Sequence, residues 1–136
     1  MSNATSYTFG TRLPGNIASV RPAVEAALKA EGFGILTEID VQATMKAKLG
    51  VDREPYVILG ACNPALAHRA LEVDPSVGAL LPCNVVLRAD GQQTIVEALD
   101  PMAALGIADA PGVRSVAEEA KARLGRAIAT LAAGAA

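Results

Sequence analysis

Both cysteines of the chain and its only histidine fall between residues 62 and 83. Cys62 stands directly before Asn63-Pro64, and Cys83 directly follows Pro82. A cysteine thiolate is a nucleophile and a ligand for soft metals, and an electropositive setting favours it. This segment is therefore the first place to look for chemistry.

The Asn63-Pro64 step predicts the start of a helix, because asparagine is a preferred N-cap and proline is favoured at the first helical position. The positive end of that helix would stabilise a thiolate at Cys62 and lower its pKa. Cys83 is expected to begin a strand, and the two thiols would approach each other if their strands are neighbours. Three functional alternatives are then open: a redox pair, a nucleophilic or sulfur-carrying thiol, and a soft-metal site. The structural alternative is that both cysteines are small buried packing residues.

A complete structural zinc site is not expected here, because such sites normally use four ligands. The segment offers three candidate metal ligands, Cys62, Cys83 and His68, and the chain contains no Cys-x-x-Cys pair. His68 falls off the apolar stripe of its predicted helix, so we expect it to be exposed. A soft transition metal, copper or zinc, could still be bound between two chains.

Two groups of polar residues are secondary candidates. Glu38 and Asp40 flank Ile39 at the end of a predicted strand, so both carboxylates would point to one face. Paired carboxylates can perform acid–base chemistry or hold a cation, but Asp40 is also a suitable helix N-cap, which is the interpretation we favour. The amides of Asn63 and Asn84 could bind a ligand, although capping and turn hydrogen bonds also explain them.

Composition limits the classes of protein to which this chain can belong. The 136 residues suit one domain, and with 51% hydrophobic but only 3% aromatic residues the core must be aliphatic. The formal charge of -2 argues against a nucleic-acid partner, which normally requires a basic surface. No apolar run approaches the ~18 residues of a membrane span, and the N-terminus does not resemble a secretory signal. We therefore expect a cytoplasmic location, where thiols stay reduced.

Hydrophobic periodicity and turn residues predict the element order β-α-β-α-β-α-β-β-α. The expected strands cover residues 5–12, 33–39, 56–59, 83–89 and 92–99. Asp90-Gly91 predicts a hairpin between the last two strands, which fixes at least one antiparallel pair. The apolar run 56–59 is typical of a central strand covered on both faces. We predict an α+β fold with a mixed or mainly antiparallel five-stranded sheet and helices packed mainly on one face.

The predicted helices begin at capping side chains. Asn16 could cap the first helix, but Pro22 would then lie in the helix interior and remove a hydrogen bond. A start at Ser19 places Pro22 in the first turn, which is locally less costly and is the start we favour. Further helix starts are expected at Asp40, at Asn63 and at the capping box Ser115-Val116-Ala117-Glu118.

Three segments closely resemble the domain of unknown function 302 family: residues 32–40, 59–64 and 81–86, with 98–101 as a further match. The Cys-Asn-Pro and Leu-Pro-Cys-Asn motifs look like the mark of one branch of that family. The resemblance implies a small α+β fold, similar to the curved antiparallel sheet with helices of the TATA-box-binding-protein-like arrangement, and a dimer would fit it. It implies no catalytic residue, because the family has no settled activity.

The resemblance covers roughly residues 5–105, and a C-terminal helix over 115–133 fits it more loosely; we expect one domain over 1–136. Our first hypothesis is a cytoplasmic, homodimeric module that binds a small molecule or a metal around Cys62, Asn63 and Cys83. The second is a redox or sulfur-transfer protein, an enzyme or a carrier, that uses the Cys62 thiolate. The third is a structural or protein-interaction domain with buried thiols.

Overall fold

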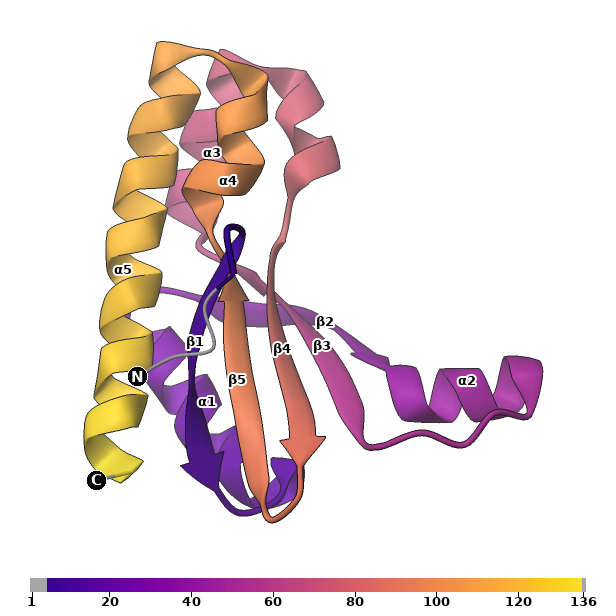
Figure 1. Ribbon diagram of the computed structural model, residues 1–136. Coiled ribbons are helices and arrows are strands. Elements are labelled where there is room, and N and C mark those ends of the chain that lie inside the picture. Colours follow the sequence, from indigo (N-terminus) through magenta and orange to yellow (C-terminus); the bar gives the residue numbers. More distant parts are fainter. Residues whose placement is uncertain (1–4, 136) are drawn as a thin grey trace.

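One antiparallel sheet forms the frame of the molecule (Figure 1). The structure is a computed structural model, and it describes residues 5–135. Its strands are β1 (Thr8–Pro14), β2 (Gly34–Asp40), β3 (Tyr56–Cys62), β4 (Cys83–Asp90) and β5 (Gln93–Leu99). They lie in the order β1-β5-β4-β3-β2, and every neighbouring pair is antiparallel. The predicted α+β fold is confirmed, and the sheet has no parallel pair.

The helices are unevenly distributed around the sheet. They are α1 (Ile17–Ala30), α2 (Val41–Leu49), α3 (Pro64–Val73), α4 (Pro101–Leu105) and α5 (Pro111–Ala135), with short 3-10 segments at Pro75–Leu80 and Gly106–Ala108. Helices α1 and α5 cover one face of the sheet, while α3 and α4 lie beyond the strand ends against α5 (Figure 1). Helix α2 projects away from the sheet edge (Figure 1). In the described part of the chain, no helix is long and apolar enough to cross a membrane.

Two apolar cores result from this arrangement. The first lies between the sheet and the helices α1 and α5, and it includes Leu59 and Leu87, each 0% exposed. The second joins α3, α4 and the N-terminal half of α5 around Leu66, Leu105 and Val116. Helix α5 contributes to both cores and therefore holds the two parts together.

The first helix begins at Ile17, so the favoured start at Ser19 is wrong. Asn16 is the N-cap, and its side-chain oxygen accepts a hydrogen bond from the Ser19 N–H at 2.8 Å. Pro22 consequently lies inside the helix. A capping bond is worth ~1 kcal/mol, and the packing of Ile17 against the first core adds to it. Together these gains offset much of the hydrogen bond that is lost at Pro22.

The last helix begins at Pro111, four residues before the predicted capping box, so that boundary is also wrong. Proline suits the first helical position, and the Arg114 N–H already donates to the Ala110 carbonyl at 2.9 Å. Ser115 therefore lies inside the helix and does not cap it. Its hydroxyl oxygen accepts a hydrogen bond from Arg69 of α3 at 3.3 Å.

Strand β3 is fully covered on one face and only partly covered on the other, so the expectation from its apolar run holds in part. Leu59 and Ala61 point into the first core and are 0% exposed, whereas Tyr56 and Ile58 are half-buried on the open face. The run is apolar on both faces because Ile58 still packs beside its cross-strand neighbours in β2 and β4. Strand β1 extends to Pro14, which the sheet edge tolerates.

Candidate functional site

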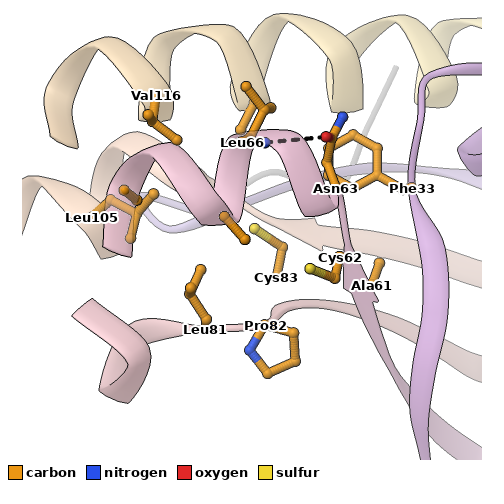
Figure 2. A pocket seen from close by; sticks show the side chains of 13 residues that line it. Phe33, Ala61, Cys62, Asn63, Leu66, Leu81, Pro82, Cys83, Leu105 and Val116 are labelled. Carbon is orange, nitrogen blue, oxygen red and sulfur yellow. Dashed lines mark hydrogen bonds between the residues drawn. The ribbon is translucent and has the colours of Figure 1, made fainter. Parts of the chain in front are cut away.

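The two thiols lie at the junction of the two cores, beside a small cavity. The cavity is bounded by the end of β3, by α3, by the Leu81-Pro82 step and by side chains from α4 and α5 (Figure 2). Its volume is about 20 Å³, and almost all of its lining is apolar. One water molecule needs ~10–15 Å³ on this measure, whereas small-molecule sites usually have ~300–1,000 Å³. The cavity therefore has no room for an organic ligand.

The pairing of β3 with β4 brings the two cysteines to this cavity. Ala61 lies opposite Cys83 in the ladder, and Cys62 follows as the last residue of β3. Both sulfur atoms lie between α3 and the Leu81-Pro82 step (Figure 2). Cys83 is 8% exposed and Cys62 is half-buried. Both are free thiols, so they do not form a disulfide pair here.

Burial determines the protonation of both thiols. It raises the pKa of the Cys62 thiol, which is the opposite direction from the expected effect of a helix N-terminus. Burial, together with the neighbouring Cys62, raises the pKa of Cys83 to about 11. The N-terminus of α3 offers few free donors, because Pro64 has no N–H and the Leu66 N–H donates to the Asn63 side chain. Burial therefore favours the neutral thiol at both positions.

Asn63 is a structural link between two helices. Its side-chain oxygen accepts the Leu66 N–H at 3.3 Å, and its amide nitrogen donates to the carbonyl of Glu31, after the end of α1, at 3.4 Å (Figure 2 shows the first bond). Gly32 has φ +86°, and a Cβ at that position would lie 2.8 Å from the Asn63 amide nitrogen. Asn63 therefore caps α3, as predicted, and it also joins α1 to α3, which was not predicted.

The remaining predicted ligands do not gather around the cavity. His68 is exposed on α3, as expected, and Asn84 is exposed on the face of β4 opposite to Cys83. Among residues 5–135, no group of three or more His, Cys, Asp or Glu side chains could hold a metal ion. The set of Cys62, Cys83 and His68 is therefore not assembled as a metal site within one chain.

Glu38 and Asp40 have separate partners. Glu38 accepts a hydrogen bond from Arg21 of α1 at 2.7 Å, and this bond lowers the pKa of its carboxyl. Asp40 caps α2 by accepting the Ala43 N–H at 2.8 Å, so its predicted capping role is confirmed. Each carboxylate thus has a structural interaction that accounts for its position.

The open face of the sheet carries charges that pair with one another. Arg88 of β4 donates to Glu97 of β5 at 2.9 Å, and the Glu97 side chain is only 12% exposed. Arg12 of β1 pairs with Asp90 at the end of β4. These pairs leave the centre of the open face electrostatically compensated.

An exposed apolar arm is the feature that the sequence did not reveal. We define the arm as residues 34–54, which comprise β2, α2 and the loop that returns to β3. No residue of α2 is buried. Four of the eight large apolar side chains that are exposed within residues 5–135 belong to the arm. They are Leu36 (66%), Ile39 (50%), Leu49 (69%) and Val51 (47%).

The arm could have been suspected from its composition. Its helix has a single narrow apolar stripe, at Val41, Met45 and Leu49, and that stripe can pack against only one surface. The spacing of these residues indicated that the helix needs a surface to pack against, but not where that surface lies.

Comparison with known proteins now identifies the family. The model described as "Domain of unknown function DUF302" matches residues 9–131. The chain belongs to the DUF302 family. The match extends the DUF302 resemblance beyond residue 105 and includes most of α5.

A solved DUF302 structure has the same fold. It is the uncharacterized conserved protein DUF302 from Bacillus stearothermophilus, and it superposes with a TM-score of 0.85 at 27% sequence identity. The alignment covers 93% of this chain and 99% of that chain. No curated protein matches this chain significantly. The comparisons therefore establish the DUF302 family and its fold without naming an activity.

Proposed function

We propose that this DUF302 domain acts by binding another protein chain and that Cys62 and Cys83 are packing residues. The observation that carries this proposal is the 20 Å³ apolar cavity, which leaves no room beside Cys62 and Cys83 for organic ligands of ordinary size. It corresponds to the third hypothesis from the sequence, and the exposed apolar arm adds a surface on which a partner could bind.

The energetics of the cavity support this reading. Forming a thiolate at Cys83 would place a charge among apolar side chains, and its pKa of about 11 reflects that penalty. A soft metal would need at least one further ligand beside the two thiols, and His68 is exposed elsewhere on α3. Packing is thus the role that the surroundings of both cysteines favour.

The test is the alkylation rate of each cysteine as a function of pH, read by mass spectrometry on the native and the unfolded protein. We expect Cys83 to react only after unfolding and Cys62 to react slowly, with an apparent pKa above the free-thiol value of about 8.5. Metal analysis of the same sample should find no bound metal in proportion to the protein. Rapid labelling of Cys62 with an apparent pKa well below that value would refute the proposal.

Partial access to Cys62 supports a second candidate function. Cys62 is half-buried, in contrast to Cys83, and it precedes the N-cap of α3. A redox or sulfur-transfer role, or a soft metal shared between two chains, would use this accessible thiol. Retained metal that disappears in the Cys62→Ala variant, but not in Cys83→Ala, would favour the metal form of this alternative.

We also propose that the protein functions in the cytoplasm. The two free cysteines support a reducing compartment, in which thiols of this kind persist. Detection of the protein in a fractionated native host would test this location. Recovery mainly in an oxidising compartment would contradict it.

A further inference from the structure

We propose that the arm joins two copies of this chain as a homodimer. In this dimer the free edges of the two β2 strands meet in antiparallel fashion, and α2 of each copy packs beside α1 of the other. The inference rests on the proposed protein-binding function and names its partner and surface. It concerns residues 34–54, none of which lines the thiol cavity, although Gly34 at the start of β2 lies opposite Cys62 in the β2–β3 ladder.

Helix α2 needs a partner surface for its stability. It has nine residues, none of them buried, and isolated helices shorter than ~12–15 residues are marginal in water. Its ends are well formed, with Asp40 as N-cap and Gly50 in the left-handed conformation at φ +66°. Val41 and Met45 are only half-buried in their own chain and Leu49 is exposed, so the apolar stripe of this well-capped helix still has surface that another chain can cover.

The free edge of β2 has few of the usual protections. It is the last strand in the sheet order, so its outer backbone groups have no strand partner. Edge strands are commonly protected by lysine, proline, other charges or a β-bulge; β2 has no lysine or proline, and its protections are the carboxylates Glu38 and Asp40 and one register shift. A register shift between Ile35 and Thr37 leaves Leu36 exposed at the edge. This edge therefore presents both hydrogen-bonding groups and apolar surface.

A second copy fits this surface because of the order of β2 and α2 in the chain. If two β2 strands run antiparallel about a two-fold axis near their middle, the C-terminal end of one lies beside the N-terminal end of the other. Helix α2 follows Asp40 at that C-terminal end. The α2 helix of one copy therefore extends beyond Gly34, the first residue of β2, in the other copy.

An open hollow lies where the helix of the second copy would arrive. It measures about 410 Å³ and is lined by Gly32, Phe33, Gly34 and Ile35 together with α1. The contributing α1 residues are Glu25, Ala26 and Lys29. The hollow can receive side chains of the α2 stripe, of which Val41 and Met45 are half-buried and Leu49 is exposed in their own chain.

Charge and size agree with this occupant. Helix α2 carries Lys46 and Lys48 and no acidic residue, but Lys46 already pairs with Asp52, and Glu25 at the rim of the hollow already pairs with Arg21. The attraction between copies therefore rests on Lys48 and the C-terminal, electronegative end of α1. Lys29 is the one like charge among the residues that line the hollow. The arm comprises about twenty residues, of which a part faces its own sheet, so together with the α1 residues at the hollow it offers a surface toward the lower end of the ~20–30 residues per side of a standard interface.

The decisive experiment measures the mass of the protein in solution by sedimentation equilibrium over a range of concentrations. The chain has a mass of 13.9 kDa, and we expect twice that mass for the unmodified protein. The double variant Leu36→Lys/Leu49→Lys should raise the dimer dissociation constant by about 100-fold or more, because both apolar contacts become charged. The matched control is Ile107→Lys, at a side chain that is 73% exposed but lies outside the arm, and it should remain a dimer.

A second readout reports on β2 itself. In hydrogen exchange, the β2 amides of the unmodified protein should be protected and those of the double variant should exchange at least about tenfold faster, since edge amides lose their partner. Circular dichroism of the double variant should show an unchanged fold, because none of the altered side chains is buried. Equal β2 exchange rates in the two proteins would overturn the proposed strand pairing.

The outcomes separate this inference from the proposed function. A monomeric unmodified protein, or a double variant that stays dimeric, overturns the arm dimer. If Cys62 alkylation is slow in that case, the protein-binding proposal stands with a different partner. If Cys62 labels rapidly while the arm variant dissociates, the dimer stands and the assignment of the thiols to packing fails.

Discussion

The thiol cavity and the arm differ in both residue type and exposure: the cavity contains reactive residues that are largely buried, whereas the arm contains ordinary apolar residues that are exposed. The cavity has the residue types with the greatest chemical reactivity, Cys62 and Cys83, in an apolar space of about 20 Å³ where burial raises the pKa of both thiols. The arm has ordinary apolar residues, but they are exposed on a strand and a helix that bury little of their own surface. Residue type alone directs attention to the first region, whereas exposure directs it to the second.

The difference should appear most strongly in a matched pair of leucines. Leu66 lines the cavity and is 5% exposed, and Leu66→Ala should lower the free energy of unfolding by ~2–4 kcal/mol, because it enlarges a core cavity. Leu49 in the arm is 69% exposed, and Leu49→Ala should change the stability of the monomer by less than ~0.5 kcal/mol. Urea unfolding at concentrations below the dimer dissociation constant checks both values. Equal losses would mean that the arm packs within its own chain.

The alkaline stability of the protein should depend on Cys83. Its folded-state pKa of about 11 lies above the unfolded value of about 8.5, so the folded chain retains a proton that the unfolded chain loses. Stability is therefore unaffected below pH ~8.5 and falls as the pH rises toward 11, by roughly 3 kcal/mol at most.

Comparison with Cys83→Ala isolates this effect from the titration of other groups. The difference in unfolding free energy between the two proteins should narrow steadily across that alkaline range, whereas Cys62→Ala should produce a smaller change because Cys62 is half-buried. A constant difference between the unmodified protein and Cys83→Ala would show that Cys83 is not buried as a neutral thiol.

Removing either of two helix caps should have an effect of intermediate size on stability. Asn63 caps α3 and joins it to α1, so Asn63→Ala should destabilise the whole domain by ~1–2 kcal/mol. Asp40 caps α2, and Asp40→Ala should unfold that helix locally with a much smaller effect on global unfolding. Global stability is read from urea unfolding and local opening from hydrogen exchange of α2. A larger global loss for Asp40→Ala would contradict the independence of the arm.

The smallest expected effect concerns the ion pair between Glu38 and Arg21. That hydrogen bond lowers the pKa of Glu38, so its stabilising contribution is present above the unfolded-state pKa and is lost as the pH falls through the lower, folded-state value. Glu38→Gln should slightly flatten the acid limb of the stability curve. Glu119→Gln should flatten it more, because Glu119 bonds to both Arg69 and Arg123. Identical acid limbs for all three proteins would show that neither pair contributes measurably.

Local sequence signals predicted most of the fold. The Asp90-Gly91 hairpin, the Asn63-Pro64 helix start and the Asp40 cap all appear where the residues indicated. The errors occurred where tertiary contacts outweighed a local preference. Pro22 is tolerated inside α1, and Ser115 contacts Arg69 and does not cap α5.

The candidate site was less predictable, for a physical reason. The sequence brought Cys62 and Cys83 to one region, but the volume around them depends on side chains from α4 and α5 that are distant in the chain. Helix-dipole reasoning predicted a lowered pKa for Cys62, whereas burial raises it. Likewise, the apolar stripe of α2 was visible in the sequence, but its lack of a buried surface appears only in three dimensions.

One sedimentation experiment compares the two regions most directly: the unmodified protein, Cys62→Ala/Cys83→Ala and Leu36→Lys/Leu49→Lys are measured at the same concentrations. If the arm carries the interaction and the thiols only pack, the variant without cysteines associates like the unmodified protein and the arm variant sediments as a monomer of 13.9 kDa. If the folded variant without cysteines dissociates while the arm variant stays associated, the thiols and not the arm carry the interaction, and the account is wrong.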